Sequence, residues 1–167
     1  MTDQATGIRV RPMAAADLDG VLAIAESLPD APHWPRAAYI KALDPASTPE
    51  RIALVAVSPG PDAVAGFAVA SLLPPQAELE SIAVAAASQR RGMGRRLFGA
   101  LMIELKQAGA TELLLEVRAS NLAALGFYRA LGFIETGRRP RYYADPVEDA
   151  VLMQLWLSWP EEGPYRR

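Results

Sequence analysis

The stretch between residues 77 and 117 constrains the fold most, because it runs through strand, loop, long helix and strand. Ala77 to Val84 is expected to form a strand, and a helix is expected to begin at about Met93. The apolar residues of this helix fall on one stripe and are Met93, Leu97, Phe98, Leu101, Met102 and Leu105. Glu112 to Val117 is apolar on both faces, as central strands covered by helices are. This order predicts parallel pairing of the two strands through a right-handed crossover.

The rest of the chain continues this mixed α/β pattern. Further strands are expected early in the chain, over residues 7–11, 51–57 and 64–73. Further helices are expected over residues 17–27, 35–43 and 121–131. Two closing strands, 133–136 and 151–157, are expected on either side of a polar, proline-containing loop. The sequence therefore predicts the α/β (α+β) class, with a mixed sheet flanked by about four helices.

The length of 167 residues and the mass of 18.0 kDa suit one domain with a real core. We expect this domain to span residues 1–159, followed by a mobile tail over residues 160–167. No aliphatic run approaches the roughly 20 residues that a bilayer span needs, and the first residues lack the pattern of a signal peptide. We therefore expect a cytoplasmic protein with no membrane partner.

Composition excludes several kinds of chemistry. The chain has no cysteine, so cysteine nucleophiles and thiolate metal sites are excluded. His33 is the single histidine, which excludes a multi-histidine centre, and no metal is predicted. A formal net charge of −2 gives no overall case for nucleic-acid binding.

The junction between the loop and the long helix carries the strongest local motif, Gln89 to Arg95. Gly92 and Gly94 let the backbone approach a ligand where a helix begins, and free amides and the helix dipole favour an anion there. Arg90, Arg91 and Arg95 add positive charge. No Gly-Lys-Ser/Thr ends the motif, so it is not a Walker loop. The alternative is that the glycines serve helix packing and the arginines form a solvated face.

A second constellation runs from Leu115 through Asn121 to Phe133. Asn121 and Tyr128 are seven residues apart, which is two helical turns, so both can face the same ligand. Further along lie Gly137-Arg138-Arg139, Tyr142-Tyr143 and Glu148-Asp149-Ala150.

These motifs resemble those of a known superfamily. Gln-x-x-Gly-x-Gly after Ser81-Ile82-Ala83-Val84 is similar to the acyl-CoA loop of the GNAT N-acetyltransferases. Leu-Glu-Val-Arg-Ala-Ser-Asn, followed by Phe-Tyr and Leu-Gly-Phe, resembles the bacterial ribosomal-protein alanine N-acetyltransferases, the RimI type. The similarity covers about residues 77–157. It implies a GNAT-like, mostly antiparallel sheet with a central parallel pair.

The resemblance implies acetyl-CoA as the cofactor, with coenzyme A as the product. The loop residues implied to bind its phosphates are Gln89, Arg90, Arg91, Gly92, Met93, Gly94 and Arg95. The strand at Ile82, Ala83 and Val84 would pair with the pantetheine arm, and the amide of Val84 would stabilise the oxyanion. Asn121 and Tyr128 are also implied to contact the cofactor.

The resemblance assigns Glu116 as general base and Tyr128 as general acid. An α-amino group with a pKa near 8 is largely protonated at neutral pH, so a carboxylate must first remove a proton, directly or through a water. Tyr128 would then protonate the departing thiolate. Because the chain lacks cysteine, direct transfer in a ternary complex is favoured.

Several assignments have alternatives. Glu80 is a rival base, Glu116 could simply pair with Arg118 across one strand face, and Tyr128 could be a packed core aromatic. The candidate acceptor-binding residues are Trp34, Glu80, Arg138, Tyr142 and Tyr143. Residues 138 to 143 could instead form a solvated turn.

By resemblance, the acceptor is a protein with a free N-terminus, namely the N-terminal alanine of small-subunit ribosomal protein eighteen. Other protein N-termini, lysine side chains or a small amine are alternatives. A different class of function is a non-catalytic acyl-CoA-binding module on the same fold. The oligomeric state does not follow from the sequence.

Overall fold

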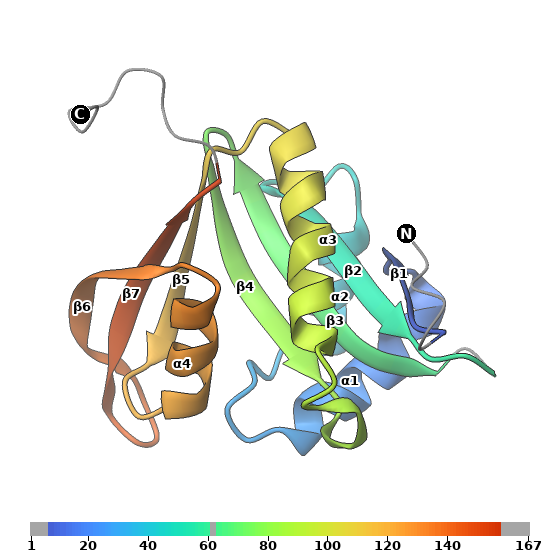
Figure 1. Ribbon diagram of the computed structural model, residues 1–167, viewed down its shortest axis with the longest axis horizontal. Helices are drawn as coiled ribbons and strands as arrows, with labels where there is room; N and C mark the ends of the chain where they lie inside the picture. The colour runs from blue at the N-terminus through green and yellow to red at the C-terminus, as the bar shows by residue number, and fades with distance from the viewer. Residues whose placement is uncertain (1–6, 61–62, 158–167) are drawn as a thin grey trace.

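The computed structural model describes residues 7–60 and 63–157 (Figure 1). Its strands are β1 (Arg9–Pro12), β2 (Glu50–Val57), β3 (Val64–Leu73), β4 (Gln76–Val84), β5 (Glu112–Arg118), β6 (Ile134–Tyr143) and β7 (Glu148–Trp156). Its α-helices are α1 (Leu18–Ser27), α2 (Arg36–Leu43), α3 (Met93–Gln107) and α4 (Leu122–Ala130). The expected tail at 160–167 and part of the turn after β2 lie outside the described residues.

The described strands form one sheet in the order β1-β2-β3-β4-β5-β7-β6. Strands β4 and β5 are parallel and joined through α3, as predicted from the strand-helix-strand pattern. Every other neighbouring pair in this sheet is antiparallel. The predicted α/β class and the mostly antiparallel sheet with a central parallel pair are therefore confirmed.

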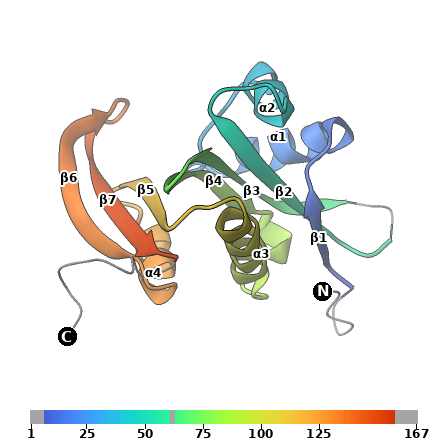
Figure 2. The same cartoon turned by 90° about the horizontal axis from the view of Figure 1, so that it is seen from above.

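The two parallel strands diverge soon after they meet. They pair only at three positions, from Gln76 opposite Glu112 to Glu78 opposite Leu114. Just beyond, β4 carries a bulge at Glu80: Val69 of β3 pairs with Ser81, whereas Ala70 pairs with Leu79. A bulge bends its strand, and β4 follows β3 while β5 stays paired with β7 (Figures 1 and 2). The sheet therefore opens between β4 and β5 toward their carboxyl ends.

The helices cover both faces of the sheet (Figure 2). Helices α3 and α4 pack on one face, and the predicted apolar stripe of α3 is confirmed, with Leu97, Leu101 and Leu105 fully buried. Helices α1 and α2 pack on the other face, around Tyr39 and Phe67. None of the helices among the described residues is long and apolar enough to cross a membrane.

The closing hairpin differs from the expected one. Most of the polar loop that was predicted after residue 136 is instead paired strand. Strand β6 continues to Tyr143, and β7 begins at Glu148. Strand β6 is an edge strand whose side chains are almost all exposed, so it lacks the apolar alternation that marks a half-buried strand. The hairpin therefore extends much further from the core than predicted.

Candidate active site

A cavity of about 610 Å³ occupies the opening between β4 and β5. Strand β4 lines it from Leu79 to Val84, and β5 lines it from Leu115 to Arg118. The start of α4 and the loop Leu28–His33 complete the wall. The cavity therefore lies where the bulge in β4 separates the two central strands.

A second cavity of about 460 Å³ runs along the junction between β4 and α3. Residues of the predicted phosphate loop line it: Gln89, Arg90, Gly92, Met93, Gly94 and Arg95. Both cavities are lined by Ile82, Ala83, Val84 and Tyr128, so they adjoin. An extended ligand can therefore reach from the N-terminus of α3 to Tyr128.

The loop backbone explains its glycines. Gly92 has φ 75° and caps α3, in the left-handed region that suits glycine. A Cβ at Gly94 would lie 3.3 Å from the ring of Phe127, so a larger residue would push on α4. The side-chain amide of Gln89 donates a hydrogen bond of 3.0 Å to the carbonyl of Val84, which ties the loop to the end of β4.

Two predicted loop residues lie differently from the rest. Arg91 is exposed and is not among the residues that line either cavity. The side chain of Met93 is buried in the core, so Met93 can offer only its backbone to a ligand.

Glu116 lies on β5, with Leu115 and Val117 turned into the core beneath α3. Its side chain is 20% exposed and lines the larger cavity. Its Oε1 lies 3.2 Å from Nη1 of Arg139 on β6. The alternative pairing of Glu116 with Arg118 is wrong, because Arg118 instead contacts Glu148 at 3.3 Å.

Glu80, the rival base, is held by another residue. Both of its carboxylate oxygens accept hydrogen bonds from Arg51 on β2, at 2.7 and 3.2 Å. Glu78 was not predicted as part of the site. Desolvation and the nearby charges of Glu116 and Glu80 raise the pKa of Glu78, while Arg139 opposes this effect. These carboxylates make the wall near Glu116 acidic.

Tyr128 lies where the two cavities adjoin. Its ring packs against Phe127 and Phe133, so Tyr128 also has the contacts expected of a packed core aromatic. Burial, and then the nearby Tyr143, raise the pKa of Tyr128 to about 12. The hydroxyl therefore stays protonated at neutral pH, as a proton donor requires.

Asn121 lies at the cavity wall and caps α4. Its side-chain oxygen accepts a hydrogen bond of 3.1 Å from the amide of Ala124. Its side-chain NH₂ group remains the part that can contact a cofactor.

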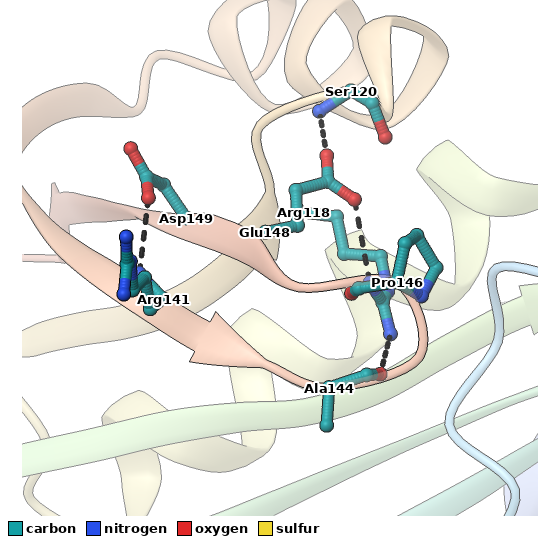
Figure 3. Close-up of polar contacts among 7 residues, drawn as sticks. All are labelled: Arg118, Ser120, Arg141, Ala144, Pro146, Glu148 and Asp149. Atoms are coloured by element: carbon teal, nitrogen blue, oxygen red, sulfur yellow. Dashed lines mark hydrogen bonds and ion pairs between the residues drawn. The ribbon is translucent and has the colours of Figure 1, made fainter.

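The tip of the β6–β7 hairpin is fastened to the start of α4 (Figure 3). The guanidinium of Arg118 reaches the carbonyls of Ala144 and Pro146 and the carboxylate of Glu148. Glu148 also accepts a hydrogen bond of 2.5 Å from the amide of Ser120. Arg118 lies 4.4 Å from the centre of the Tyr143 ring. Tyr143 is thereby held in the cavity wall.

The predicted acceptor residues do not all gather at the cavity. Glu80 and Tyr143 line it, whereas Trp34 packs against Tyr39 and is not part of the lining. Arg138 contacts Glu135 at 3.0 Å, away from the lining. Tyr142 is about half exposed, and a hydrogen bond with the Glu116 carboxylate raises its pKa. His33 and the loop before it line the cavity in place of Trp34.

Comparison with known proteins decides the family. The model of the acetyltransferase (GNAT) family matches residues 21–133. The chain belongs to the GNAT acetyltransferase family. The resemblance inferred from the loop and from the Asn121 region is thereby confirmed.

Within the GNAT family, several relatives are named as ribosomal protein bS18-alanine N-acetyltransferases. The one from Salmonella typhimurium is 46% identical over 99 residues, which are 58% of this chain and 67% of the relative. The one from Haemophilus influenzae is 38% identical over 97 residues, which are 66% of its length. These matches therefore span about two thirds of each relative.

Solved GNAT structures extend the likeness to nearly the whole chain. The ribosomal-protein-S18-alanine N-acetyltransferase from Escherichia coli has a TM-score of 0.78 and 31% identity, over 95% of this chain and 99% of that one. Ard1 from Thermoplasma volcanium has a TM-score of 0.78 and 28% identity, over 90% of this chain and 97% of that one.

Proposed function

We propose that this chain is an acetyl-CoA-dependent N-acetyltransferase that modifies a protein N-terminal amine in the cytoplasm, with the N-terminal alanine of ribosomal protein bS18 as its preferred acceptor. The observation that carries the proposal is the position of a carboxylate, Glu116, and a protonated phenol, Tyr128, in the wall of one cavity. The names of the relatives supply the acceptor.

The residues present fit the cofactor. The smaller cavity joins the N-terminus of α3 to Arg90 and Arg95, which suits a phosphate-bearing ligand. Its continuation past Val84 to Tyr128 suits an extended arm. Bound acetyl-CoA supplies the acetyl group as an activated thioester.

The protein's own groups handle the protons. Glu116 takes a proton from the ammonium of the acceptor, so that the nitrogen lone pair becomes free to attack. Tyr128 holds its proton on Oη and delivers it to the sulfur as the bond between the carbonyl carbon and the sulfur breaks. The attacking nitrogen loses its second proton to solvent as the amide forms, and Tyr128 regains a proton from solvent. The amide of Val84, at the carboxyl end of β4, stays the proposed donor to the oxyanion.

The acceptor is proposed to enter from the side of the Leu28–His33 loop and the β6–β7 hairpin, because Glu116 lies on the sheet face away from α3. On this arrangement the cofactor and the acceptor approach from opposite sides of the opening. That arrangement suits direct transfer in a ternary complex.

A thiol-release assay with acetyl-CoA tests the proposal. The acceptors are an alanine-starting peptide with the bS18 N-terminal sequence, the same peptide with a blocked N-terminus, free lysine and spermidine. Release with only the unblocked peptide is expected. Release only with lysine or spermidine would support acetyl transfer but show that the acceptor is not a protein N-terminus. Binding of acetyl-CoA with no release for any acceptor would favour the non-catalytic module.

A further inference from the structure

The carboxylate proposed as the base is engaged from the neighbouring hairpin. Arg139, on β6, places its Nη1 3.2 Å from Oε1 of Glu116. Tyr142, on the same strand, forms a hydrogen bond with that carboxylate. The guanidinium carbon of Arg139 lies 5.7 Å from the centre of the Tyr142 ring, so the two β6 side chains support each other.

Glu116 lies in a predominantly acidic and phenolic setting. Glu78 approaches it from β4, Tyr142 and Tyr143 approach it from the hairpin, and Glu80 lines the same cavity. Arg51 is committed to Glu80, and Arg118 is committed to Glu148. Among the described residues, Arg139 therefore provides the ion pair to Glu116.

The two neighbouring arginines of β6 have different partners. Arg138 contacts Glu135 within its own strand, whereas Arg139 reaches across β7 to β5. A catalytic base commonly needs a third group that fixes its orientation. The bonds to Glu116 from β6 have that arrangement.

We propose that Arg139 is a positioning residue for acetyl transfer, whose guanidinium orients the Glu116 carboxylate through their ion pair. This inference rests on the proposed function, in which Glu116 receives the proton of the acceptor. Arg139 is not among the residues that line either cavity, whereas Glu116 lines the larger one. Arg139 is therefore expected to affect the rate through Glu116.

The split between kcat and KM for the peptide acceptor tests the inference. Arg139→Gln removes the ion pair to Glu116, so it should lower kcat by roughly fivefold, a size typical of a partly exposed ion pair, with little change in KM. Arg139→Lys keeps the charge and should restore most of kcat. The Kd for acetyl-CoA should be unchanged in both variants.

Arg129→Gln is the matched control. Arg129 is as exposed as Arg139, at 57% against 58%, and it contacts Glu135 at 3.7 Å outside both cavities. This variant should retain the wild-type kcat and KM. A wild-type kcat in Arg139→Gln, a loss carried by KM alone, or a lysine variant no better than the glutamine one would overturn the inference.

Glu116→Gln separates this inference from the proposed function. If Glu116→Gln keeps the wild-type kcat, the proposed base is wrong, and the role of Arg139 fails with it. If Glu116→Gln is inactive while Arg139→Gln keeps the wild-type kcat, only the inference about Arg139 fails.

Discussion

The guanidinium of Arg51 donates two hydrogen bonds to the carboxylate of Glu80, at 2.7 and 3.2 Å. The pair reaches across β3, and each side chain is less than one-fifth exposed. The hydrogen bond with Glu80 raises the pKa of Arg51, as expected for a tight pair. Glu80 is therefore committed to a structural contact, whereas the ion pair of Glu116 is with an exposed arginine.

We predict opposite effects for substitutions at the two carboxylates. Glu80→Gln should lower the free energy of unfolding by about 2 kcal/mol, because it weakens a largely buried charged hydrogen bond, and should change kcat by less than about threefold. Glu116→Gln should lower kcat by about 100-fold or more, the usual worth of general base catalysis. Denaturant unfolding and thiol release measure the two quantities. A larger fall in kcat for Glu80→Gln would make Glu80 the base.

The hydroxyl of Tyr128 gives the second prediction. Tyr128→Phe should lower kcat by about 100-fold, because the departing thiolate loses its proton donor, and the Kd for acetyl-CoA should change little. Tyr39→Phe is the control, since it removes a buried hydroxyl that has no hydrogen-bond partner and lies outside both cavities. That variant should retain both kcat and the melting temperature. An active Tyr128→Phe would leave Tyr128 as a packing residue.

The raised pKa of Tyr128 predicts the alkaline side of the pH profile. Because burial moves this pKa from 10.0 to about 12, the hydroxyl keeps its proton across the range in which the acceptor amine deprotonates. The kcat/KM of the wild type should therefore rise from pH 6 and stay level between about pH 8.5 and 10. A fall near pH 9 that is absent from Tyr128→Phe would contradict this assignment. The stability that this tyrosine contributes is complete below its ordinary pKa and is lost as pH rises toward 12.

The central crossover was predictable from sequence because its signals are local. The apolar stripe from Met93 to Leu105 and the apolar strand at 112–117 lie within single elements, and each fixes its own secondary structure. The motif around Gly92 and Gly94 likewise marks a helix start within a few residues.

The contacts that distinguish Glu80, which is held by Arg51, from Glu116, the proposed base, were not predictable in this way. Glu80 and Arg51 are 29 residues apart, and Glu116 and Arg139 meet only because β7 lies between β5 and β6. The bulge that opens the cavity is a one-residue shift in pairing, which leaves no periodic signal. The exposed edge strand β6 has the polar composition of a loop, so the length of the hairpin was also missed.

The arginines of the phosphate loop give the fourth prediction. Arg90 and Arg95 line the smaller cavity, whereas Arg91 does not. Arg90→Ala and Arg95→Ala should each weaken acetyl-CoA binding by about tenfold, a loss typical of one charge-assisted hydrogen bond, and Arg91→Ala should weaken it least. Isothermal titration calorimetry at two salt concentrations measures this order, and higher salt should reduce the differences. Equal losses for all three would indicate a diffuse positive field instead of specific contacts.

The last prediction concerns the contacts of Arg118 and Glu148 that fasten the tip of the β6–β7 hairpin, which we call the clamp. Glu148 accepts hydrogen bonds from Ser120 and Arg118, and these bonds, that of Ser120 first, hold its pKa below the usual range. Glu148→Ala should therefore release the turn at residues 144–147 from the start of α4. Hydrogen exchange should become faster in that turn, while the amides of α3 keep their protection.

Loss of this clamp should also lower the rate of acetyl transfer, because Arg118 holds Tyr143 in the cavity wall. The kcat/KM of Glu148→Ala for the peptide should fall severalfold with no change in the Kd for acetyl-CoA.

Since the pKa of Glu148 is lowered, the clamp is complete above the ordinary glutamate pKa and is lost as pH falls through the lowered value. Faster exchange in the wild-type turn is therefore expected only below about pH 4.5. Glu135→Ala, which breaks ion pairs at the other end of β6, should leave the turn protected. Equal exchange in the turns of Glu148→Ala and the wild type would show that the β6–β7 ladder alone holds the tip.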